Sequence, residues 1–269
     1  EYPGGRRIFH KVPVSLSEPN VYLMDMAEYA LDQEPYQDVE EILKLENLCR
    51  ERCGLPIRKR AMQQPYQMRK EAAHHTIRLR FTIESEIRLP APVLAMENMD
   101  VCQLWLDGKK IEPRDMGWVM DRIIRTTPLP SISAGTHVLE AAFPLGLNTK
   151  LEYMYLLGDF GVSVAGCEKT ITAPVRELAF GDWAHQGLPF YSGNVTYHVS
   201  LETQGGGCVR VPHYRGAMVG LCVDGGEEQP IIYSPYVCDL SALEAGSHQF
   251  DFTLYATRYN TLAALHHLS

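Results

Sequence analysis

The chain has 269 residues, of which 45% are hydrophobic and 22% charged, the composition of a globular protein of one or two domains. This composition excludes a disordered chain, a coiled coil and a membrane span. The formal net charge is −8, and the longest basic cluster is residues 58–60. We therefore expect no nucleic-acid partner and no membrane partner.

The cysteines favour a reducing compartment. There are seven of them, an odd number, and Cys102 and Cys222 lie within apolar runs, as reduced core thiols do. We expect a cytoplasmic rather than a secreted protein. Because the chain begins with Glu1 and not with Met, we also expect it to be a piece of a longer polypeptide.

One helix is predicted early in the chain, within a helical insertion of about residues 36–75. Gln37 and Asp38 supply a polar start, and Gly54 followed by Pro56 supplies the end. Apolar residues recur between these points near a spacing of 3.6, at Val39, Ile42, Leu43 and Leu48. The polar stretch 63–74 is compatible with either helix or loop.

From residue 76 onward, short runs of alternating apolar and polar residues are separated by Gly, Pro and Asn. The clearest runs are 77–83, 195–201 and 250–255. Such alternation predicts half-buried antiparallel strands, and many of them at short intervals indicate a β-sandwich or barrel. The absence of strand–helix alternation argues against a parallel α/β sheet.

An internal repeat organises these strands. The alternating strand 77–83 is followed by Leu-Trp-Leu-Asp-Gly at 104–108 and by Ser-Ala-Gly-Thr-His-Val-Leu-Glu at 133–140. The strand 195–201 is followed by Leu-Cys-Val-Asp-Gly at 221–225 and by Glu-Ala-Gly-Ser-His-Gln-Phe-Asp at 244–251, an offset of 111 to 118 residues. We predict two β-sandwiches, at 1–168 and 169–269. His137 and His248 share one repeat position, which indicates a structural role in a turn.

The same segments resemble the galactose-binding-like jelly rolls that accompany large bacterial glycoside hydrolases. More specifically, WAHQGLPFYSGNVTY at 183–197 resembles the W-x-x-x-G-x-P-x-Y-S-G-x-x-x-Y segment that opens the C-terminal sandwich of α-L-rhamnosidase-like and family-2-like enzymes. Residues 20–25, 151–161 and 232–236 resemble further segments of those proteins.

The resemblance implies a mostly β fold of two tandem jelly-roll sandwiches with a short helical N-terminal segment. It also implies a non-catalytic carbohydrate-binding or accessory region of a bacterial glycoside hydrolase. The partners would be a glycan or oligosaccharide and the upstream catalytic domain of the same polypeptide. No Asn-Glu dipeptide, which carries the acid of family-2-like enzymes, occurs in the chain. A structural calcium ion is compatible with the resemblance, but no acidic loop has ligand spacing, so no metal site is assigned.

Sugar binding by a sandwich requires an exposed aromatic face and polar groups at loop tips. The candidates are Trp118, Asp121, Trp183, Tyr191 and Tyr236. For Trp183 and Tyr191 the alternative is that both rings fill the end of a sandwich core. A small intact glycosidase is a second possibility, and its carboxylate pair would come from Asp121, Glu140, Glu152 and Asp159. A pure domain-packing module is the third.

Overall fold

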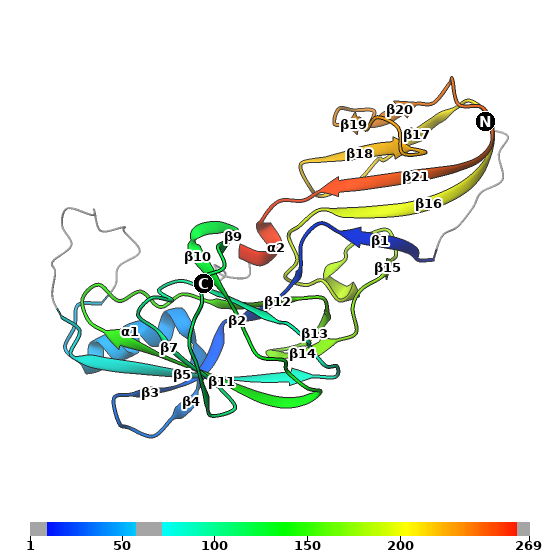
Figure 1. Ribbon diagram of the computed structural model, residues 1–269. Coiled ribbons are helices and arrows are strands. Elements are labelled where there is room, and N and C mark those ends of the chain that lie inside the picture. Colours follow the sequence, from blue (N-terminus) through cyan, green and yellow to red (C-terminus); the bar gives the residue numbers. More distant parts are fainter. Residues whose placement is uncertain (1–9, 58–71, 263–269) are drawn as a thin grey trace. The chain divides into compact units, whose positions relative to one another are not determined.

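The computed structural model describes residues 10–57 and 72–262 and shows a mostly β protein (Figure 1). Its chain forms two compact units. The first unit consists of Val21–Gly158 and Val164–Thr172; the second consists of the residues up to Asn20, Asp159–Ser163 and the residues from Ala173 onward. The sequence predicts a boundary between two independently folding domains at residues 168 and 169. The two units are defined by their contacts and not by independent folding, so that boundary stays a prediction.

Two antiparallel sheets enclose the core of the first unit, the arrangement of a β-sandwich. The larger sheet has the order β4-β3-β5-β11-β7-β8, and β14 (Glu168–Thr172) pairs parallel to β5. Its strands are β3 (Met26–Leu31), β4 (Gln37–Glu41), β5 (His75–Ser85), β7 (Gln103–Leu106), β8 (Lys109–Ile111) and β11 (Gly135–Leu145). The chain passes between the units inside β13 (Gly161–Ala165).

The second sheet of the first unit has the order β2-β12-β6-β10-β9. Its strands are β2 (Asn20–Met24), β6 (Val93–Met96), β9 (Trp118–Val119), β10 (Asp121–Pro128) and β12 (Met154–Gly158). On β5 the alternation behaves as predicted, because Ile77, Leu79, Phe81 and Ile83 are buried while the residues between them are not.

Helix α1 (Ile42–Arg52) begins later than predicted. Residues 37–41 form β4 instead, since they pair with β3 through Met26↔Glu41 and Ala27↔Glu40, and this tertiary pairing overrides a helical start. The side chain of Glu41 caps the helix by accepting a hydrogen bond from Lys44 N. The predicted end is confirmed, because Cys53 follows the helix and Gly54 has a φ of +66°. Most of the stretch 63–74 lies outside the described residues.

A six-stranded sheet of order β15-β1-β16-β21-β18-β19 and a small sheet β17-β20 form the second unit. These strands are β1 (Val12–Leu16), β15 (Glu177–Leu178), β16 (Val195–Gln204), β17 (Cys208–Arg210), β18 (Met218–Val223), β19 (Gln229–Ile231), β20 (Val237–Asp239) and β21 (Ala245–Tyr255). Two short helices, η2 (Ala184–Gln186) and α2 (Tyr259–Leu262), also belong to this unit.

The sheets of the two units follow one plan, which confirms the internal repeat. The path β3-β5-β11-β7-β8 of the first unit corresponds strand by strand to β1-β16-β21-β18-β19 of the second. The pair β6-β10 corresponds likewise to β17-β20. Among the residues that the structure describes, the second unit has two strands opposite its large sheet, where the first unit has five.

The repeated Asp and His residues form the same clasp in both units, as the shared position of the histidines predicted. In the first unit, Asp107 has a φ of +50°, its Oδ1 accepts from Val138 N at 2.9 Å, and its Oδ2 lies 2.7 Å from His137 Nδ1. In the second unit, Asp224 also has a φ of +50°, and its two oxygens bind Gln249 N at 2.8 Å and His248 Nδ1 at 2.6 Å. Each clasp ties the end of one strand to the start of its antiparallel neighbour.

A third clasp of the same kind lies in the first unit and was not predicted. Asp32, with a φ of +51°, binds Thr76 N at 2.8 Å and His75 Nδ1 at 2.8 Å, and so joins the end of β3 to the start of β5. The hydrogen bonds from His75 and from the Thr76 amide lower the pKa of Asp32. The chain thus uses one local device at three strand ends.

Candidate functional site

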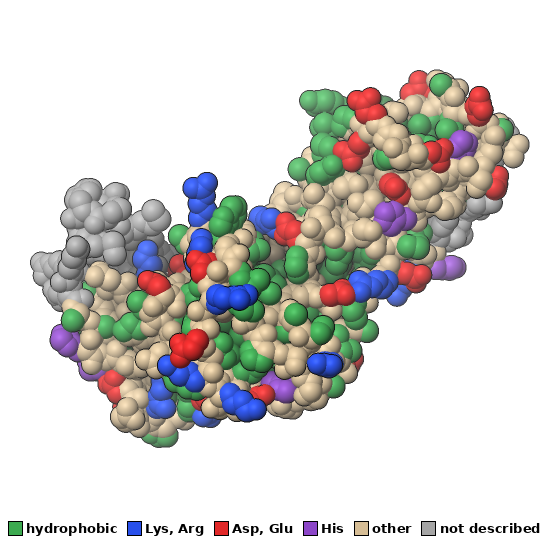
Figure 2. All heavy atoms as spheres, in the orientation of Figure 1, with side chains coloured by type: hydrophobic (Ala, Val, Ile, Leu, Met, Phe, Trp, Pro, Cys, Tyr) green, Lys and Arg blue, Asp and Glu red, His purple; other side chains and the backbone are tan. Residues whose placement is uncertain are grey.

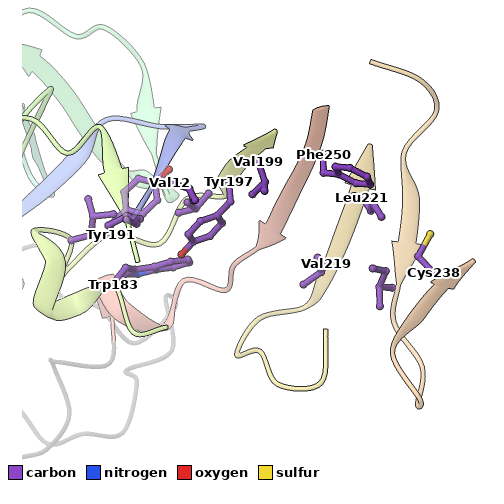
Figure 3. Close-up of a cluster of buried hydrophobic side chains, with 13 residues drawn as sticks. Val12, Trp183, Tyr191, Tyr197, Val199, Val219, Leu221, Cys238 and Phe250 are labelled. Carbon is purple, nitrogen blue, oxygen red and sulfur yellow. The ribbon is translucent and has the colours of Figure 1, made fainter. Parts of the chain in front are cut away.

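Trp183 and Tyr191 lie in the core of the second unit (Figure 3). Trp183 is 6% exposed and Tyr191 0%, and their rings meet edge to face with centroids 6.3 Å apart. The Tyr191 hydroxyl donates to Asn194 O at 2.9 Å and accepts from Glu18 N at 3.3 Å. Because neither ring presents a free face to solvent, the structure supports the alternative interpretation, in which both rings fill the core.

Tyr236 is half-buried in the same unit. Its ring packs edge to face against Tyr214 with centroids 5.7 Å apart, and the Tyr214 hydroxyl donates to Ile231 O at 3.2 Å. Tyr236 thus anchors the segment that connects β19 and β20. Of the predicted aromatic residues, the structure leaves Trp118 as the one whose ring is open to solvent.

Trp118 and Asp121 both lie on the hairpin formed by β9 and β10 in the first unit. Met120, with a φ of +62°, turns the chain between the two strands. Trp118 is 54% exposed, and two more apolar side chains of the hairpin, Met116 and Ile123, are exposed to a similar extent. An exposed aromatic ring on the same hairpin as two exposed aliphatic side chains is the kind of surface that binding sites use.

Charged groups surround this apolar surface. Arg125 lies directly opposite Trp118 in the strand register, so the two side chains leave the ribbon on one face. Asp115 holds the Arg125 guanidinium, accepting from Nε at 3.1 Å and more closely from the second amino group, and it also accepts from Gly117 N at 2.8 Å. Arg125 and the Gly117 amide together lower the pKa of Asp115, which is therefore ionised at neutral pH.

The Asp121 carboxylate retains a free acceptor. Its Oδ1 accepts from Ile123 N at 3.0 Å, and the other oxygen has no hydrogen-bond partner among residues 10–57 and 72–262. Asp121, however, lies opposite Val119 in the register, so its side chain leaves the ribbon on the other face from Trp118 and Arg125. The face that carries Trp118 therefore offers an aromatic ring and a fixed guanidinium. This set can stack on the apolar face of a pyranose and hydrogen-bond its hydroxyls.

Sequence reasoning found Trp118 and Asp121 but missed Asp115 and Arg125. Their ion pair could have been anticipated from opposite charges on the two sides of a short hairpin. That inference requires the strand register, which shifts between Asp121 and Arg125 and so does not follow from counting residues.

The carboxylates considered for catalysis bind unrelated partners. Glu140, on β11, accepts from the Tyr36 hydroxyl at 2.9 Å and from Arg80 Nε at 3.3 Å. Asp159, in the second unit, forms an ion pair with Arg176, and Asp121 lies on the hairpin of the first unit.

The cysteines and histidines suggest no second kind of site. All seven cysteines are present as thiols. Burial raises the pKa of Cys49 to about 11 and that of Cys102 to about 12, so these two thiols are protonated and unreactive. Within the described ranges, no three His, Cys, Asp or Glu side chains are arranged to hold a metal ion. Nor does any helix in those ranges have the length and apolar character needed to cross a bilayer.

No family model matches the sequence, and no curated protein matches it. Among solved structures, the chain is similar to a GH2 β-galacturonidase from Eisenbergiella tayi, with 9% identity and a TM-score of 0.32, covering 87% of this chain and 36% of that one. A β-D-mannosidase from Dictyoglomus thermophilum gives 11% identity and a TM-score of 0.32, with coverages of 88% and 31%. The chain therefore spans about a third of the length of both proteins.

A third solved structure has a different description. An anti-sigma factor domain-containing protein from Clostridium clariflavum gives 12% identity and a TM-score of 0.25, with coverages of 88% of this chain and 90% of that one. Matches at such identities and TM-scores carry no argument about function, so the proposal below depends on the geometry of the hairpin.

Proposed function

We propose that the chain is a non-catalytic carbohydrate-binding or accessory region of a glycoside hydrolase, and that the Trp118 hairpin binds its glycan. The observation that carries this proposal is the exposed Trp118 ring, which shares its face of the hairpin with Arg125, the partner of Asp115 in an ion pair. A tryptophan ring is large and costly to leave in water, and its flat face matches the C–H face of a pyranose.

The size and charge of the surface favour a sugar over a macromolecule. Stable protein interfaces bury about 800 Å² on each partner, more than three exposed apolar side chains supply. The charges on the hairpin have mixed signs, and the whole chain carries −8, so a polyanion finds no basic patch here. Neutral hydroxyl groups suit a carboxylate paired with a guanidinium, because the carboxylate accepts and the guanidinium donates hydrogen bonds in fixed directions, and a hydroxyl can do either.

The catalytic domain would belong to the same polypeptide, outside this chain. Under the alternative of a pure packing module, that domain would cover Met116, Trp118 and Ile123, and no glycan would bind. A cytoplasmic location and a structural calcium ion stay predictions of the sequence and the resemblance.

Titration with galactose- and rhamnose-containing oligosaccharides tests the proposal. The chain has three tryptophans, so each indole N–H signal can be assigned and followed by NMR. We expect the Trp118 signal to shift with added oligosaccharide and the signal of the buried Trp183 to stay in place. Trp118→Ala should weaken binding about tenfold, or about 1.4 kcal/mol.

Matched variants separate binding from folding. Trp118→Phe keeps an aromatic face and should retain most of the affinity, and Tyr259→Ala removes an exposed ring elsewhere. A folded wild-type chain that binds none of the oligosaccharides would overturn the proposal. Self-association of the isolated chain that Trp118→Ala abolishes would then favour the packing module.

A further inference from the structure

The second unit carries an exposed aromatic ring in the connecting segment that corresponds to the one around Trp118. Trp118 lies between the edge strand β8 and the strand β10, and Tyr233 lies between the corresponding strands β19 and β20. In each unit the residue just before the second strand has a left-handed backbone, with a φ of +62° at Met120 and +57° at Tyr236. Tyr233 is 82% exposed, which is more than Trp118.

The segment around Tyr233 is held firmly on both sides. Tyr233 O accepts from Tyr236 N at 2.7 Å, which closes the turn, and Tyr236 O accepts from Val211 N at 3.0 Å. On the inner side, the Tyr236 ring packs on Tyr214, whose hydroxyl is bound to Ile231 O. The backbone of the turn is thereby fixed while the Tyr233 ring projects outward, so binding a ligand would cost little ordering entropy.

The surroundings of Tyr233 fit a small flat ligand. Ile232 and Val237 are exposed beside it, and Figure 2 shows hydrophobic side chains gathered at the end of the unit near β18 and β19. Three exposed apolar side chains are too few for a stable protein interface, whereas one aromatic ring matches the apolar face of one sugar ring. The hydroxyls of Tyr233 and of the exposed Ser234 can both donate and accept hydrogen bonds.

We infer that Tyr233 is a second glycan-binding platform, so that the chain holds one sugar site in each unit. This inference rests on the proposed function for its class of ligand, but it uses a different residue in a different unit. Two sites on one chain let a repetitive polysaccharide bind through both, and the second contact then adds avidity without new chemistry.

Stoichiometry tests the inference. The oligosaccharide from the galactose and rhamnose panel that binds most tightly is titrated calorimetrically into the wild type, Tyr233→Ala, Trp118→Ala and the double variant. We expect two sites of wild-type affinity per chain in the wild type, one such site in each single variant and none in the double variant. Tyr233→Phe, which keeps the ring, should retain two sites, and Tyr259→Ala serves again as the control.

The outcomes distinguish this inference from the proposed function. A single site that Trp118→Ala removes and Tyr233→Ala leaves unchanged would overturn the second platform alone. A single site that only Tyr233→Ala removes would support the platform and overturn the assignment of Trp118. Absence of any binding to the folded wild type would overturn both. If two sites are present, Tyr233→Ala should also weaken retention on immobilised galactan at least tenfold.

Discussion

Each unit has a large sheet built on the same plan, but the two units cover these sheets differently. In the first unit, five hydrogen-bonded strands lie opposite this sheet, and in the second unit the small pair β17-β20 does so. The second unit fills the remaining core with large side chains from the irregular segment 183–191, including Trp183, Leu188 and Tyr191 (Figure 3). A β-sheet can therefore be closed either by more strands or by a few bulky aromatic rings, provided that the apolar area is buried.

The outward faces of the two large sheets also keep one position in common and differ in the residues that occupy it. The cross-strand pair Arg80–Glu140 of the first unit has its counterpart in His198–Asp251 of the second. In the first unit, the Tyr36 ring also covers Arg80, whose guanidinium carbon lies 3.6 Å from the ring centroid. The two units therefore share the position of this cross-strand polar pair, but they use different residues for it.

The largest predicted effect breaks the aromatic closure of the second unit. Tyr191→Ala removes a fully buried ring and its two hydrogen bonds, and we expect a loss of about 3–5 kcal/mol in the free energy of unfolding. Urea unfolding followed by circular dichroism measures this loss. Trp118→Ala, which removes an exposed ring, should change the stability by less than about 0.5 kcal/mol. Equal losses in the two variants would contradict the assignment of Tyr191 to the core.

The next effect concerns helix α1, which belongs to the first unit. Arg50 and Glu46 form an ion pair whose side chains are both 3% exposed, and they bind the backbone at Thr149 O and Leu147 O and at Leu151 N. Arg50→Met would leave the Glu46 carboxylate buried without its cation, at a cost of about 3 kcal/mol. The control Arg52→Met breaks an exposed ion pair with Glu34 and should cost less than about 1 kcal/mol. Similar thermal midpoints for the two variants would show that the buried pair does not anchor the helix.

A smaller effect sharpens the comparison of the clasps. Although partial burial opposes it, hydrogen bonds from the Val138 amide and His137 lower the pKa of Asp107, so its carboxylate stabilises the fold. Asp107→Ala removes those hydrogen bonds and places alanine in a left-handed conformation, and we expect a loss of about 1–2 kcal/mol in unfolding experiments. Asp107→Asn should cost less, because asparagine tolerates this conformation. An equal cost for both variants would assign the effect to the carboxylate charge alone.

The smallest effect is the pH dependence of the clasp in the second unit. The hydrogen bond to Asp224 raises the pKa of His248 above 6.5, and that bond together with the Gln249 amide lowers the pKa of Asp224 below 3.8. The contribution of His248 is complete below pH 6.5 and is lost as the pH rises through its raised pKa, while that of Asp224 is lost as the pH falls through its lowered pKa. The stability difference between the wild type and His248→Gln should therefore be larger at pH 5.5 than at pH 8.5. A difference that does not change between these two pH values would exclude a charged histidine in the clasp.

The sequence by itself determined the mostly β class, the long strands and the internal repeat. Alternation at 77–83, 195–201 and 250–255 predicted β5, β16 and β21 because a half-buried strand exposes every second residue. The Asp-Gly dipeptides predicted matching turns because they act within their own hairpins, β7–β8 and β18–β19. Each of these signals comes from residues that are close together in the sequence, so it can be recognised without knowing which strands pair.

Only the tertiary structure decided what depends on distant partners. Residues 37–41 became a strand because β3 lies beside them, and Tyr191 is buried because Trp183 and the large sheet surround it. Arg125 joins the Trp118 surface through an irregular register, and Tyr233 stands out because the strands around it match those around Trp118. Whether an aromatic side chain fills a core or faces a ligand is settled by the elements that pack around it, and residue type alone does not contain that information.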